Sequence, residues 1–378
     1  MNAEQEQIYS KRSTQIVNIL KGLAIWMVVT VHFFQSISMH TYIEMLANCM
    51  QLGYQIFFTL SCFTLCLSFN KQKLSYWQYF KKRVLKLFLA YYVMIIFGVA
   101  YRVVFAVKGG TSVIDAINIK GVIINALFLN GLVPNPIVHN QIVRDGWFIG
   151  TLFILYLLFP LLYKLFTIKN QKWQKSKVVV FPLLTILVSA IIIGAIYVVF
   201  GFGSYPFFVY TSFINQICAF VFGFVIFYLY QTVKIKKVKL PLLKAIISAI
   251  LAIVLFIKIP LAHYIIVIVL VALATTYTFC FLFNNAFTKE MLDSELIMRF
   301  LAKTGTISLG IYYTHSYLVW DVTLKIIEII YKLDTNPHVL IKACVGIIIY
   351  TACYWVGKLF TYLIKLVQTP LLKGLKVK

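Results

Sequence analysis

Two ionisable side chains, Lys21 and His32, stand inside the first long apolar run of the chain. Histidine is the side chain that ordinarily gains and loses a proton near neutral pH, so it can serve as a base. An α-helix would place the two residues on one face, roughly 16 Å apart. Ionisable groups inside a membrane are costly, and each one therefore indicates a functional site. Two plainer explanations stay open: Lys21 could extend its ammonium group to the membrane edge, and His32 could hydrogen-bond to a neighbouring helix.

The composition predicts that these residues sit in a membrane protein. Of the 378 residues, 61% are hydrophobic and only 12% are charged, about half the charged fraction of a soluble domain. Apolar runs long enough to cross a bilayer recur along the chain. The sequence therefore predicts an all-α polytopic membrane protein, a single bundle of about ten transmembrane helices. The expected spans are residues 16–34, 52–69, 84–107, 147–165, 178–200, 207–230, 242–257, 261–283, 304–320 and 340–364.

A further apolar segment, residues 121–133, is too short to cross comfortably and is expected to be re-entrant or interfacial. The basic residues support this interpretation, because cytoplasmic loops carry the excess of Lys and Arg. With ten crossings and a cytoplasmic N-terminus, 25 of the 35 basic residues fall on the inner side. If 121–133 crossed, the five lysines of 164–177 would move outside. We therefore expect a multi-pass protein of the cell membrane with both termini in the cytoplasm.

The distribution of charge and cysteine excludes several other classes of protein. The net charge of +24 collects in short loops between apolar runs, which fits membrane orientation and not nucleic-acid binding. The seven cysteines form no C-x-x-C pair and read as buried apolar residues, so neither a disulfide framework nor a metal site is expected. We divide the chain into a cytoplasmic tail (1–15), one transmembrane domain (16–366) and a second cytoplasmic tail (367–378).

A second polar stripe lies in the span near the C-terminus. Ser308, Tyr312 and His315 are spaced i, i+4, i+7 and would share one helical face. All eleven acidic residues fall outside the apolar spans, so no pair of carboxylates is available inside the membrane for acid–base chemistry or a proton relay. This leaves histidine as the candidate base, and it weighs against an ion-coupled transporter.

Several separated stretches resemble the acyltransferase-3 family of integral membrane acyltransferases, and together they cover nearly the whole chain. Lys21 to His32 resembles the first-helix motif, a basic residue, ten residues and then histidine, although the family usually has arginine at the basic position. Residues 53–63 resemble the second-helix pattern, with Cys62 in place of its glycine. Residues 81–86 resemble the basic run that opens the third helix, and Ser308 to His315 resembles the signature near the end. Trp147-Phe148 with residues 156–162 is similar to a further family pattern.

The resemblance implies transfer of an acyl group, usually acetyl from acetyl-CoA, to a hydroxyl of an envelope glycan or lipid-linked sugar. His32 would be the general base or a transient acyl carrier. His315, Ser308 and Tyr312 would orient the acceptor or stabilise the developing oxyanion. No metal is expected to take part.

The resemblance also suggests residues for the two substrates. Lys82, Arg83 and Lys86 would form a cytoplasmic cationic patch for acyl-CoA, with Lys21 as a further donor-side residue, and ordinary positive-inside anchoring is the plainer explanation of the patch. Trp147 would stack on a sugar ring or anchor the protein at the membrane interface. Asp145 would orient a histidine.

Two other functions remain open from the sequence. A polytopic transporter or flippase for a lipid-linked or small anionic substrate would suit the basic architecture, but intramembrane acids and a clear inverted repeat are missing. A non-catalytic sensor or assembly subunit is the third possibility.

Overall fold

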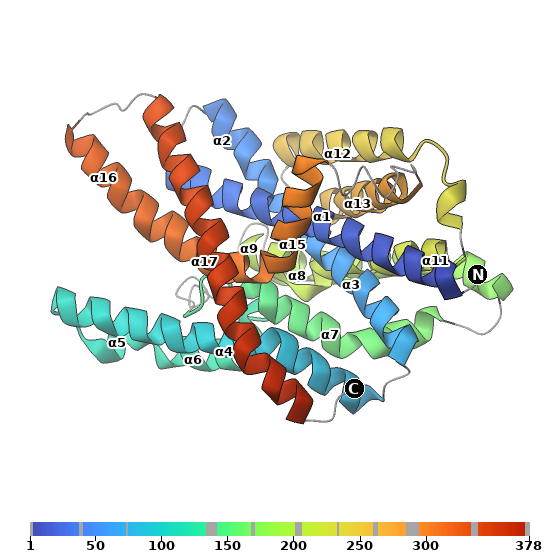
Figure 1. The fold of residues 1–378 in the computed structure, drawn as a ribbon, viewed down its shortest axis with the longest axis horizontal. Coiled ribbons are helices and arrows are strands. Elements are labelled where there is room, and N and C mark those ends of the chain that lie inside the picture. Colours follow the sequence, from blue (N-terminus) through green and yellow to red (C-terminus); the bar gives the residue numbers. More distant parts are fainter. Residues whose placement is uncertain are drawn as a thin grey trace. The chain divides into compact units, whose positions relative to one another are not determined.

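The computed structural model describes residues 3–37, 41–72, 75–133, 142–167, 171–200, 206–232, 234–259, 264–284, 295–333 and 339–374. These residues form helices joined by turns, and no strand occurs among them (Figure 1). The helices divide into two compact units, one made of Met1–Ser61 and Val225–Leu363, the other of Cys62–Phe224 and Ile364–Lys378. Each unit is described by itself below.

The first unit is built on α1 (Ala3–Ser36), which packs against α15 (Leu296–Ser316). The remaining elements of this unit are α2 (Thr41–Asn48), η1 (Cys49–Leu52), η4 (Lys234–Lys237), α12 (Pro241–Lys258), α13 (Ile266–Asn284), the π-helical segment η6 (Tyr317–Val322), α16 (Thr323–Leu333) and most of α17 (Val339–Gly374). α12 packs along α13 (Figure 1). The beginning of α3 (Gly53–Gln72) and most of α11 (Phe222–Gln231) also belong here.

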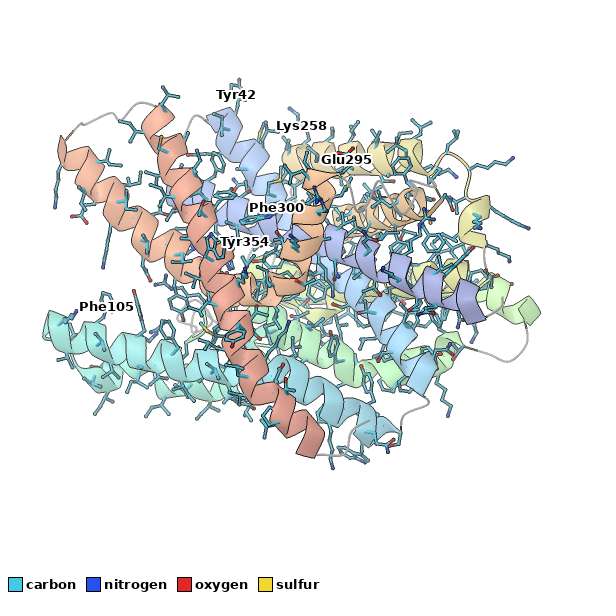
Figure 2. The ribbon with its side chains drawn as sticks, in the orientation of Figure 1. Tyr42, Phe105, Lys258, Glu295, Phe300 and Tyr354 are labelled. Carbon is cyan, nitrogen blue, oxygen red and sulfur yellow. The ribbon has the colours of Figure 1, made fainter. Side chains whose placement is uncertain are left out.

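Glycine lets α1 and α15 approach backbone to backbone. A methyl group at Gly305 of α15 would overlap the carbonyl oxygen of Asn18, and one at Gly22 of α1 would overlap the carbonyl oxygen of Leu301. Small residues at such crossings allow the close van der Waals contact that holds membrane helices together. α15 also meets α17, where Phe300 and Tyr354 stack with ring centroids 5.8 Å apart (Figure 2). These contacts fix the position of α15, the helix that carries His315.

The second unit contains the middle of the chain. Its helices are α4 (Tyr76–Gly109), α5 (Val113–Ile117), α6 (Ile119–Ala126), η2 (Leu129–Gly131), α7 (Trp147–Phe166), α8 (Gln171–Phe200), α9 (Pro206–Thr211) and α10 (Phe213–Phe220). The start of α4 is fixed by a capping box in which Ser75 and Gln78 exchange hydrogen bonds with each other's backbone. Where the chain passes from α6 to η2, a buried network has Tyr91 and Asn130 both donating to the side-chain oxygen of Asn125, each at 2.9 Å.

The prediction of an all-α polytopic membrane protein is confirmed. Nine helices in the described part of the chain are long and apolar enough to cross a membrane. The expected span at 304–320 is helical as α15 and η6, but it is not among those nine because its sequence is too polar. The short segment 121–133 forms α6 and η2, neither of which is long enough to span.

Several element bounds differ from the expected ones. The expected span at 207–230 is divided into α9, α10 and α11 by turns at Ser212 and Val221. Ser212 adopts an extended conformation, and its hydroxyl accepts from the backbone nitrogen of Asn215, which starts a new helix. α1 begins at Ala3 and α17 continues to Gly374, so helix runs into both expected tails. The side of the membrane that those tails face stays a prediction.

Candidate active site

His32 lies on α1 between two hydrogen-bonding partners. Its Nδ1 is 3.2 Å from Oε1 of Gln35, one turn further along the helix, and its Nε2 is 3.3 Å from the hydroxyl of Tyr54 on α3. The amide nitrogen of Gln35 donates to Asn48 at 3.3 Å, which leaves the Gln35 oxygen to accept from His32. Nδ1 therefore carries the hydrogen in a neutral ring, and Nε2 accepts from Tyr54. The Nε2 lone pair is the basic position.

His315 on α15 is fully buried and is held in the same tautomer. Its Nδ1 lies 2.6 Å from the backbone carbonyl oxygen of Tyr312. A carbonyl oxygen can only accept, so Nδ1 donates, and Nε2 of the neutral ring keeps its lone pair. The hydroxyl of Ser316 stands 3.4 Å from this Nε2 and can donate to it.

The two histidines, predicted from distant parts of the sequence, lie together in the first unit. Their ring centroids are 5.3 Å apart. Trp320 has its ring centroid 6.2 Å from that of His32, and it belongs to the π-helical segment η6, a distortion often found at functional sites. Tyr312 lies 5.8 Å from His315 and 6.5 Å from Tyr54, ring to ring. We refer to His32, Tyr54, Tyr312, His315 and Trp320 as the histidine cluster.

Chemically, the histidine cluster offers two neutral imidazoles whose Nδ1 hydrogens are both donated to protein oxygens. Each ring therefore presents Nε2 as a proton acceptor. His32 is half-buried, whereas His315 is fully buried, so His32 is the more accessible base. Anchoring one ring nitrogen in this way fixes the orientation of the other.

Ser308 lies at its predicted place on α15, where its hydroxyl forms a hydrogen bond within the helix. Its side chain is buried, and its hydroxyl donates to the backbone carbonyl oxygen of Gly305 at 2.9 Å. Such a bond within the helix uses the hydroxyl hydrogen, so Ser308 can offer a substrate only its lone pairs. Tyr312 is also buried and contributes its ring to the histidine cluster.

The residues expected on the donor side occupy two helices. Lys21 is half-buried on α1 and precedes Gly22, at the close contact with α15. Lys82, Arg83 and Lys86 all belong to the N-terminal part of α4 in the second unit, and their side chains lie outside the described part of the structure. Their role in binding acyl-CoA remains a prediction.

Trp147 and Asp145 belong to the second unit. Trp147 is the first residue of α7 and is only 4% exposed, with its ring 5.9 Å from that of Tyr210. So little exposed surface does not suit an anchor in the lipid headgroups. Asp145 has a positive φ of 57°, and its backbone carbonyl accepts from the nitrogen of Phe148, so it shapes the entry to α7.

Sequence reasoning missed Tyr54, Gln35 and Trp320. Gln35 follows His32 by three residues, which is the spacing of neighbours on a helical face and could have been recognised. Tyr54 lies inside the second-helix pattern, but its contact with His32 depends on how two helices pack. Trp320 depends on the π-helical segment, for which the sequence has no clear signal.

Comparison with known protein families gives a match. No curated protein and no solved structure matches the chain. Residues 15–356 match the family described as an acyltransferase domain, a stretch that contains every residue of the histidine cluster. This match covers most of the 378-residue chain. The chain therefore belongs to the acyltransferase-3 family and is a membrane acyltransferase.

Proposed function

We propose that this protein moves an acyl group, most simply acetyl, from cytoplasmic acyl-CoA to a hydroxyl of a cell-envelope glycan or lipid-linked sugar. The observation that carries the proposal is the pairing of His32 and His315, with rings 5.3 Å apart, in a chain of the acyltransferase-3 family. An oxygen nucleophile needs a base, and both rings offer Nε2 for that purpose.

His32 is the proposed general base. The acceptor hydroxyl takes the position on Nε2 that the Tyr54 hydroxyl occupies at 3.3 Å, and Nε2 removes its proton as the oxygen attacks the thioester carbonyl. The C–O bond forms, the C–S bond breaks, and the leaving thiolate takes up the proton. The hydrogen bond from Nδ1 to Gln35 stabilises the imidazolium that forms in between.

His315 and Tyr312 orient the acceptor beside this base. Both side chains are buried on one face of α15, a position from which they can bind substrate oxygens away from water. Ser308 lies on the same face of α15, and its hydroxyl donates to the backbone carbonyl of Gly305. The roles of Trp147 and Asp145 in binding the acceptor stay predictions.

The donor is proposed to approach from the cytoplasm. Lys82, Arg83 and Lys86 occur within two turns of α4, where three cations can attract the anionic coenzyme A to the protein. Lys21 completes the basic residues of the donor side. We further propose that both chain termini face the cytoplasm, on the distribution of the basic residues.

The test is transfer of label from radiolabelled acetyl-CoA to a glycan acceptor by the purified protein in vesicles. Wild type should label the acceptor, and His32→Ala should lose at least roughly 100-fold of the rate, the contribution usual for a positioned base. His338 is a histidine that is predicted to lie in an outer loop. The variant His338→Ala is the matched control and should keep the wild-type rate. Vesicles that translocate the acceptor without acylating it would favour the transporter instead.

A further inference from the structure

A group of cations and aromatic rings gathers at one end of the first unit, where three helices end together. α1 begins there, and the C-terminal ends of α11 and α13 meet it through Tyr230 and Phe283. Figure 1 shows the N-terminus beside α11. The 3₁₀ turn η4 (Lys234–Lys237) follows α11 directly. The sequence predicts that residues 1–15 face the cytoplasm, and these contacts bring η4 to the same end of the unit.

Tyr9 is the centre of this group. Its ring lies 5.1 Å from that of Phe283 and 6.4 Å from that of Tyr230. The ammonium group of Lys236 stands 5.4 Å from the centre of the Tyr9 ring. A cation over an aromatic face is attracted by the electron density of the ring, so Lys236 is held in position.

Two further cations are held in the same way. The guanidinium group of Arg12 stands 5.3 Å from the centre of the Phe283 ring and donates to the backbone carbonyl of Leu282 at 3.3 Å. Lys234 donates to the Tyr228 hydroxyl at 2.8 Å. We refer to Arg12, Lys234, Lys236 and Lys237 as the η4 patch.

The η4 patch is anchored and strongly positive. Ile235, between the lysines, is completely buried, which fixes the turn while Lys236 and Lys237 stay exposed. The sequence contains no aspartate or glutamate between Asp145 and Glu290, so the lysines of η4 have no acidic neighbour along that stretch. Several cations held at one end of the unit suit a ligand that carries several negative charges.

We propose that the η4 patch binds the phosphate groups in the nucleotide half of the acyl donor. This inference rests on the proposed function, since it assigns a binding surface for the same donor. A coenzyme A nucleotide carries three phosphate groups, which four neighbouring cations match in charge. A phospholipid headgroup could offer a single phosphate to the same surface. The experiment must therefore distinguish binding of the nucleotide from binding of lipid.

The experiment compares two donors that differ only in the nucleotide. The variant Lys234→Gln/Lys236→Gln/Lys237→Gln should raise the KM for acetyl-CoA about tenfold or more, because each lysine makes a charge-assisted contact with phosphate. The KM for acetyl-pantetheine, which has no nucleotide, should stay unchanged. Equal changes with both donors, or no change with either, would overturn the proposal.

Lys244→Gln is the matched control. Lys244 is an exposed lysine of the same unit, and its ammonium group stands 5.5 Å from the centre of the Tyr277 ring, but it lies outside the η4 patch. It should keep the wild-type KM for both donors. If Lys244→Gln raised the KM for acetyl-CoA as much as the triple variant does, the effect would come from general surface charge and the proposal would be wrong.

A binding measurement separates this inference from the proposed reaction. Adenosine 3′,5′-bisphosphate titrated into wild-type protein in nanodiscs of neutral lipid should bind, and the triple variant should lose that binding. Binding retained by the triple variant, or absent from wild type, would refute the η4 patch whether or not acyl transfer is observed. Bisphosphate binding that is abolished by anionic lipid in the nanodisc would assign the patch to lipid headgroups.

Discussion

α15 and α8 are both long helices of a membrane protein, and they differ in hydropathy and in how much of each helix is buried. α8 contains one of the most apolar windows of the chain, with a mean hydropathy of 2.7, and only 17% of that window is buried. α15 is too polar to be recognised as a span, yet Ser308, Tyr312 and His315 are all buried on it. A helix side that meets lipid must be apolar, whereas one that meets other helices can carry polar groups. Low hydropathy in α15 therefore reflects the buried polar side chains that this helix contributes to the candidate site.

The largest expected difference between α15 and α8 is in stability, when a glycine of each helix is replaced by alanine. Gly305→Ala in α15 places a methyl group against the Asn18 carbonyl, and we expect overpacking to cost about 1–3 kcal/mol or more of stability. Gly194→Ala in α8 meets no atom within 4 Å and should leave stability unchanged or slightly improve it. Thermal unfolding of both purified variants in detergent measures the effect. Equal midpoints for the two variants would contradict the close α1–α15 contact.

The second prediction removes the buried histidine of α15. His315→Gln keeps a polar side chain of similar size but loses the ring that lies 5.3 Å from His32. We expect acyl transfer to fall by roughly 100-fold, the scale of a lost positioning or acid–base group, while the protein remains folded. Transfer assays with labelled donor measure this. A folded His315→Gln protein with the wild-type rate would show that the two histidines do not act together.

The third prediction concerns the hydroxyl that donates to His32. Tyr54→Phe removes the hydrogen bond to Nε2 but keeps the ring, which packs 6.5 Å from that of Tyr312. An ordinary hydrogen bond is worth about 1 kcal/mol, and the acceptor no longer has to displace the Tyr54 hydroxyl from Nε2, so we expect kcat/KM to rise roughly fivefold. Steady-state kinetics of the folded variant measure this. An unchanged or lower kcat/KM would show that the Tyr54 hydroxyl does not compete with the acceptor for Nε2.

The smallest effect is expected from a polar pair on the surface of α16. Lys332 and Glu328 form an exposed ion pair at 2.9 Å, and the hydrogen bond from Lys332 lowers the pKa of Glu328. A lowered pKa stabilises the fold above the ordinary carboxyl range, and that contribution is lost as the pH falls through the lowered pKa. Because both groups are exposed, Glu328→Gln should leave the unfolding midpoint and the transfer rate at neutral pH unchanged. A clear loss of transfer would mean that α16 takes part in the site.

Much of this arrangement could be predicted from the sequence, because hydropathy fixes which segments are helices in a membrane. The expected span at 147–165 agrees with α7 (Trp147–Phe166) almost to the residue. The division at Ser212 was missed, since an apolar run does not reveal a local hydrogen bond that ends one helix and starts another. His32 and His315 were identified by their cost inside a membrane and by family resemblance. Their separation of 5.3 Å depends on helix packing, which hydropathy does not encode.

Helix packing also explains why the partners of His32 could not be predicted from the sequence. Tyr54 and Trp320 reach His32 from other elements, and only the fold brings them close. The exposed lysines of η4 looked like ordinary positive-inside residues in the sequence. The structure distinguishes them by the aromatic rings of Tyr9 and Tyr228 that hold two of them in place.

The central claim is that Nε2 of His32 removes the proton from the acceptor hydroxyl. The most direct measurement is the pH dependence of kcat/KM for wild type and for folded His32→Ala. The wild-type rate should fall as the pH drops and the base becomes protonated. His32→Ala should be at least roughly 100-fold slower and should lack that acid limb. A His32→Ala protein with the wild-type rate and the same acid limb would contradict the claim.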